Sequence, residues 1–223
     1  MKKELKEIEL NQERIKVIIN RKNNKNTYIK VVEGNIVVNT HFFMLDKDIE
    51  RLLILNANKI LKILNKQKSQ KLLDNQFRYL GKIYELVIRP GRKFTIEKTK
   101  DTFYIVSNYD IDKTIEKVYK KEAEILFPQL LTECLKEFNK YYHKLPPKLV
   151  IRKMRRRFGT CYYTKDQICL NSQLMKYEID LIKYVIYHEL VHFIEHNHSK
   201  KFYACLEKVC PNYKELKKKL NSF

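Results

Sequence analysis

Several short stretches in the first half of the chain are runs of apolar, largely β-branched or aromatic residues bounded by polar turn residues, and this pattern predicts β-strands. The stretches are residues 15–19, 27–32, 35–38, 77–88, 94–97 and 102–106. Asn-Lys and glycine-containing turns separate the first three, so we expect them to form a small antiparallel sheet.

Helical periodicity appears at residues 46–64, where Ile49, Leu53 and Ile60 belong to one apolar stripe and Asp46 can cap the first turn. A longer helix is predicted at 110–142, with a bend at Pro128. Strands at 148–154 and 167–171 then surround Gly159, and helices follow to the end.

This order of elements predicts an α+β fold with a strand-rich part, residues 1–109, and a helix-rich part, residues 110–223. We expect the two parts to form one enzyme-sized unit. No internal repeat is visible in the sequence.

The 223 residues include 46 Lys and Arg but only 26 Asp and Glu, which gives a net charge of +20. Most of the cations are dispersed lysines, so a solvated surface and a polyanion-binding face are both compatible with the charge. Cations cluster only between Arg152 and Arg157. This run could steer an acidic substrate or a nucleic acid to a nearby site.

The N-terminus is rich in Lys and Glu and has no apolar stretch suited to a signal peptide, and no apolar run is long enough to span a bilayer. The five cysteines include no Cys-x-x-Cys pair. We therefore expect a cytoplasmic protein with reduced thiols and no membrane partner.

The segment most informative about chemistry is His188-Glu189-Leu-Val-His192. On a helix, two histidines four residues apart project from one face and can hold one ion, typically zinc (Zn2+). Glu189 points beside that ion, where its carboxylate can take a proton from water activated by the metal. The apolar residues between 179 and 194 supply a buried face for this helix.

A catalytic zinc ion needs a third protein ligand, and His196 and His198 are the candidates. His196 is rotated about 80° from the first ligand by the helical period. A chain that turns at Asn197, a suitable C-cap, could bring His198 back over the metal, and Ser199 could cap the next helix. We favour His198, which leaves His196 exposed or in a supporting position.

Several motifs resemble the YgjP-like metallopeptidase domain of the zincin class, whose site is similar to that of SprT-like proteases. They are Arg157-Phe158-Gly159-Thr160-Cys161, where the family usually has Trp-Gly-Ser-Cys, then Ile168-Cys-Leu-Asn171, the His188 motif, His198-Ser199-Lys-Lys-Phe202, Pro211-Asn-Tyr213 and, upstream, residues 79–86. The resemblance implies a zincin-like α+β fold. It also implies His188, His192 and His198 as zinc ligands and Glu189 as catalytic base.

The predicted function is that of a zinc-dependent metallopeptidase, a hydrolase that acts on a protein or peptide. The strands flanking Gly159 could hold an extended substrate at an open sheet edge, with glycine allowing close approach of the backbone.

Two alternatives remain. Metallo-endoribonucleases of the YbeY type have three histidines at the same spacing and an RNA substrate, although glycine typically replaces Glu189 there. The chain could also be a nucleic-acid-associated or ribosome-binding module with a vestigial metal site.

Overall fold

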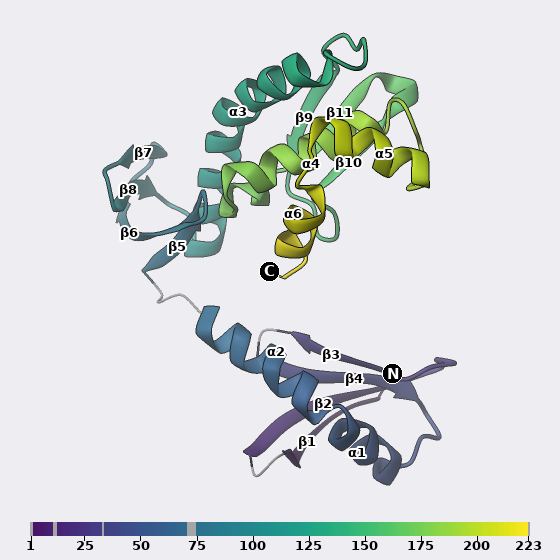
Figure 1. Ribbon diagram of the computed structural model, residues 1–223. Helices are drawn as coiled ribbons and strands as arrows, with labels where there is room; N and C mark the ends of the chain where they lie inside the picture. Colours follow the sequence, from purple (N-terminus) through teal and green to yellow (C-terminus); the bar gives the residue numbers. More distant parts are fainter. Residues whose placement is uncertain (1, 11–12, 33, 71–74, 223) are drawn as a thin grey trace. The chain divides into compact units, whose positions relative to one another are not determined.

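The computed structural model describes residues 2–10, 13–32, 34–70 and 75–222 (Figure 1). The chain divides into two compact units, Met1–Leu72 and Leu73–Phe223. Strand-rich sheets come first and helices dominate the C-terminal part, which confirms the α+β class. The predicted change from strands to helices at residue 109 lies inside the second unit, because the strands after residue 75 share a hydrophobic core with the helices that follow them.

The first unit contains a four-stranded mixed sheet. Its strands are β1 (Lys2–Leu10), β2 (Glu13–Lys22), β3 (Tyr28–Val32) and β4 (Asn35–His41), in the order β1-β2-β4-β3. Strands β2 and β4 pair in parallel, whereas the two outer pairings are antiparallel. The expectation of an all-antiparallel sheet was therefore wrong, because β3 occupies the edge and β4 returns between it and β2.

Helices α1 (Asp46–Leu55) and α2 (Ala57–Gln70) complete the first unit. Alternate residues of β2 and β4, such as Val17 and Ile36, are buried with Ile49 and Leu53 of α1. A single helix over 46–64 was predicted, but Asn56 separates two helices. Its side-chain amide donates to the carbonyl of Leu52 at 2.8 Å and so satisfies one of the last acceptors of α1.

The second unit begins with another four-stranded sheet, followed by the long helix α3 (Ile111–Phe138). Its strands are β5 (Gln76–Tyr79), β6 (Lys82–Pro90), β7 (Thr95–Lys98) and β8 (Thr102–Ser107), in the order β5-β6-β8-β7. Strand order and pairing senses are the same as in the first unit. The two units thus share a four-strand topology followed by helix, a repeat that was not visible in the sequence.

Helix α3 begins after Asp110, whose side chain accepts a hydrogen bond from the backbone N–H of Lys113, and continues through Pro128. A three-stranded sheet follows, made of β9 (Lys148–Arg152), β10 (Gly159–Tyr162) and β11 (Gln167–Asn171). The order β10-β11-β9 leaves β10 at an edge. Short 3₁₀ segments, η1 (Tyr163–Lys165) and η2 (Ser172–Lys176), flank β11.

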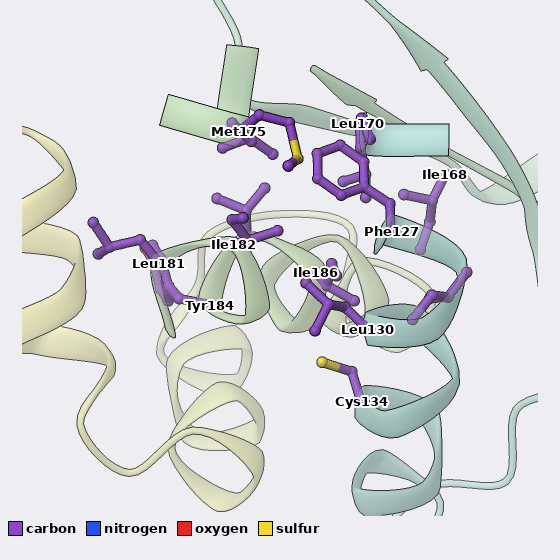
Figure 2. Close-up of a cluster of buried hydrophobic side chains, with 14 of the residues drawn as sticks. Phe127, Leu130, Cys134, Ile168, Leu170, Met175, Leu181, Ile182, Tyr184 and Ile186 are labelled. Atoms are coloured by element: carbon purple, nitrogen blue, oxygen red, sulfur yellow. The ribbon is translucent and has the colours of Figure 1, made fainter. Parts of the chain in front are cut away.

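Helix α4 (Ile179–Val191) lies in the middle of the second core, and α5 (Lys200–Val209) and α6 (Tyr213–Leu220) follow it. In Figure 2, Ile182 and Ile186 of α4 lie among Phe127 of α3 and Ile168 and Leu170 of β11. All these side chains are fully buried. Tight packing on both sides fixes the position of α4, and with it the residues that the helix projects away from the core.

The five cysteines are free thiols. Among the described residues, no helix is long and apolar enough to cross a membrane.

Candidate metal centre

Helix α4 places His188 and His192 one turn apart near its C-terminal end. Their imidazole centroids lie 5.0 Å apart. The helix ends at Val191 with His192 as its C-cap, so the C-cap expected at Asn197 was wrong. Because the helix stops early, the residues after His192 can turn back toward it.

This turn brings His198 to the same place. Its Nε2 atom lies 2.9 Å from Nε2 of His188, and its ring centroid lies 4.9 Å from that of His192. Ser199 then caps α5, as predicted, by accepting a hydrogen bond from the backbone N–H of Phe202 at 3.2 Å.

The three histidines each offer a ligand atom, and these atoms all lie within 4.8 Å of one another. Two nitrogens bound to one tetrahedral zinc ion would be about 3.3 Å apart for Zn–N bonds of about 2.0–2.1 Å. The 2.9 Å between Nε2 of His188 and Nε2 of His198 is close to this value. Three imidazoles on one point are also a donor set typical of catalytic zinc, so the residues fit the ion.

The surroundings of the histidines favour their neutral, metal-binding form. Burial, reinforced by the neighbouring His192 and His198, lowers the pKa of His188 to about 3. Burial also lowers the pKa of His192. Nδ1 of His192 donates to the carbonyl of Glu195 at 3.2 Å, which leaves its Nε2 atom as the acceptor that a metal needs.

The ring of Phe202 packs against all three imidazoles of the cluster. Its ring centroid lies 5.0, 4.7 and 4.8 Å from those of His188, His192 and His198, and its side chain is fully buried. Sequence reasoning gave Phe202 no role at the site. The sequence did contain a signal for this position: Phe202 lies four residues after His198, in the first turn of the helix that Ser199 caps.

Glu189 lies beside the histidines and faces the edge strand β10. Only 5% of its surface is exposed. Burial raises its pKa to about 8, against a hydrogen bond from the Cys161 backbone and the positive charge of Arg157, both of which favour the carboxylate. A methyl group built on Gly159 would lie 2.6 Å from Oε1 of Glu189. Glycine therefore allows the close approach of β10 to Glu189. The expected approach of a substrate backbone to Gly159 stays a prediction.

Glu189 lines two cavities of about 270 Å³ each. The first, which we call the histidine cavity, contains the three clustered histidines together with Cys161 and Tyr163. The second, the Phe158 cavity, extends from His188 toward Phe158 and helix α6. Both are lined by Arg157, Gly159, His188 and Glu189, so they meet at the catalytic candidate.

His196, the other candidate for the third ligand, interacts with groups outside the cluster of ligand atoms. Its Nδ1 atom donates to the carbonyl of His192 at 2.9 Å, and its ring stacks on Tyr163 with centroids 3.7 Å apart. It lines the histidine cavity but is not part of the three-histidine cluster.

The Lys and Arg side chains of the basic run from Arg152 to Arg157 are all exposed. Lys153 pairs with Glu116 of α3, and Arg152 donates to the hydroxyl of Tyr162 at 3.3 Å. Arg157 instead lines both cavities. Nucleic-acid binding by this run stays a prediction.

A family model described as the YgjP-like metallopeptidase domain matches residues 25–223. The chain belongs to this family. It is accordingly a metallopeptidase, an enzyme that uses a metal to hydrolyse a protein or peptide. Phe158 stands where the family usually has tryptophan, and it packs edge-on against Tyr177 with centroids 5.8 Å apart.

Two solved structures are similar to part of the chain. One is the metallopeptidase zymogen of Pyrococcus abyssi abylysin, at 24% identity and a TM-score of 0.38, over 42% of this chain and 90% of that one. The other is the zymogen of Methanocaldococcus jannaschii jannalysin, at 22% identity and a TM-score of 0.36, over 42% and 85%. No curated protein matches the chain.

Proposed function

We propose that this metallopeptidase is zinc-dependent, that His188, His192 and His198 hold the ion, and that Glu189 is the general base. The observation that carries the proposal is the position of a buried carboxylate directly beside three converging imidazoles. The YgjP-like family match supports the same assignment.

When bound, zinc would supply Lewis acidity that polarises a peptide carbonyl and lowers the pKa of water. The carboxylate of Glu189 takes one proton from the attacking water and passes it to the leaving nitrogen as the C–N bond breaks. Burial alone favours the protonated acid, whereas Arg157 and the Cys161 backbone favour the carboxylate. A cation in the cluster would shift the balance further toward the carboxylate, the form that a base requires.

Strand β10 offers a surface on which a substrate can be held. It pairs with β11 alone among the described strands, so its backbone groups, apart from the Cys161 N–H that donates to Glu189, can form hydrogen bonds with an extended peptide along the other edge. Since Gly159 of β10 also contacts Glu189, a peptide added to this edge would pass the proposed base.

The decisive experiment combines zinc analysis with digestion of a peptide library by purified protein. We expect Glu189→Gln to retain one zinc ion per chain and to lose turnover by at least about 10²-fold, the usual scale of a general base. We expect His188→Ala and His192→Ala to lose the metal. Undiminished cleavage by Glu189→Gln would exclude the mechanism, and RNA cleavage without peptide cleavage would favour the endoribonuclease alternative.

A further inference from the structure

The Phe158 cavity lies against the catalytic candidate and has apolar walls. Phe158, Tyr184, Val185 and Leu220 form these walls, and the cavity is continuous with His188 and Glu189. Its volume of about 270 Å³ is sufficient for one side chain. A peptide residue next to the scissile bond can therefore occupy it.

Two cations line the same cavity, Arg157 from the segment before β10 and Lys217 from α6. Among the described residues that line it, Glu189 alone is acidic, and this side chain is nearly fully buried.

Neither cation forms an ion pair with a described residue of the protein. Lys217 is held by a neutral group, since its Nζ donates to the hydroxyl of Tyr203 at 3.0 Å and lies 4.9 Å from the centre of that ring. On the same helix, Lys214 pairs with Glu207 and Lys219 pairs with Glu178. Lys214 and Lys219 thus have compensated charges, whereas Arg157, Lys217 and also Lys218 form no ion pair among the described residues; of these three, Arg157 and Lys217 line the cavity.

We propose that the Phe158 cavity is a specificity subsite for a carboxylate group of the substrate, bound by Arg157 and Lys217. Guanidinium and ammonium groups bind carboxylates through charge-assisted hydrogen bonds. The carboxylate can belong to an Asp or Glu side chain or to a free C-terminus beside the scissile bond. This inference rests on the proposed function and names the substrate class of the same site.

The test uses zinc-loaded full-length protein and matched peptides. One pair differs by Glu or Gln at each position flanking a cleavage site, and a second pair by a free or amidated C-terminus. We expect about tenfold higher kcat/KM for the carboxylate member of one pair, which corresponds to 1.4 kcal/mol. Whichever pair shows the preference identifies the source of the carboxylate.

The matched variants are Lys217→Gln and Lys218→Gln, neighbours on α6 of which only Lys217 lines the cavity. Lys217→Gln should reduce the preference several-fold, Lys218→Gln should leave it unchanged, and Lys217→Glu should shift it toward peptides with Lys or Arg. Arg157→Gln should also reduce the preference, although its place beside Glu189 makes Lys217 the cleaner probe.

Binding of the same labelled peptides to zinc-loaded Glu189→Gln, measured by fluorescence anisotropy, separates the two proposals. Carboxylate-selective binding that depends on Lys217, without any turnover by the wild type, would contradict the peptidase mechanism but support the subsite. Cleavage or binding that does not distinguish carboxylate from amide in either pair would overturn the subsite and leave the peptidase mechanism in place.

Discussion

Gly159 has no side chain at the point where β10 comes closest to the proposed base. In Gly159→Ala the new methyl group would lie 2.6 Å from Oε1 and 2.8 Å from Cγ of Glu189, so the carboxylate or the strand must shift. A shift of about 1 Å at a catalytic group can cost about 10²-fold in rate. We expect a loss of this order in kcat/KM with unchanged zinc content.

The control for this substitution is Gly34→Ala in the first unit, where an added methyl group meets no atom within 4 Å. The φ of 75° at Gly34 makes alanine locally unfavourable, but peptidase activity should be retained. Full activity of Gly159→Ala would mean that the approach of β10 to Glu189 is not needed for catalysis.

His198 and His196 provide a second comparison at the level of single residues. His198 lies in the three-histidine cluster, whereas His196 stacks on Tyr163. We expect His198→Ala to lose most of its zinc and His196→Ala to keep it, as measured by metal analysis after dialysis. The opposite pattern would assign the third ligand to His196.

Spacing along one helix was sufficient to predict His188, Glu189 and His192 as a group, because an α-helix fixes the relative directions of its side chains. Return of the chain at His198 was inferred from a helix C-cap at Asn197, which was wrong because the C-cap is His192; the cap predicted at Ser199 is present. The sequence did not predict that Phe202 packs against the imidazoles or that Lys217 lines the Phe158 cavity. Both depend on how α5 and α6 pack against α4, and Lys217 is one of three consecutive lysines in the sequence.

At the scale of elements, the cap of α5 connects the fold to the metal site. Ser199 follows His198 directly, and its hydroxyl accepts a hydrogen bond from the backbone N–H of Phe202. The ring of Phe202 in turn packs against the imidazoles. Ser199→Ala should cost about 1 kcal/mol of stability and weaken zinc binding, while Ser199→Asp, another good N-cap, should restore both. Chelator competition and thermal unfolding measure the two effects. Failure of aspartate to restore zinc affinity would separate the cap from the metal site.

Strand β1 was not predicted from the sequence, and its residues explain why. Its inward-facing positions begin with Glu4 and Lys6 and only then become apolar with Ile8 and Leu10. Lys6 pairs with Asp46 of α1, and Glu4 lies 3.7 Å from Nε of Arg21. Ion pairs thus replace apolar contacts on half of this face, and the alternation that identifies a strand is lost.

The whole molecule consists of two units with separate hydrophobic cores, and each unit contains a four-stranded sheet of the same topology. The second unit contains the proposed catalytic residues and both cavities beside them. It also contains the hydrophobic core against which α4 packs. None of the described residues of the first unit lines either cavity or belongs to the three-histidine cluster.

The second unit alone should therefore bind zinc and cleave peptides. A chain of residues 73–223 keeps β5–β8, α3 and every element that positions the histidines, and its 151 residues are enough to enclose a core. We expect one zinc ion per chain and a kcat/KM for short peptides within about threefold of the full-length value. Circular dichroism and thermal unfolding verify that the fragment is folded. A folded fragment that binds zinc but has lost peptide cleavage would show that the first unit takes part in catalysis or substrate binding.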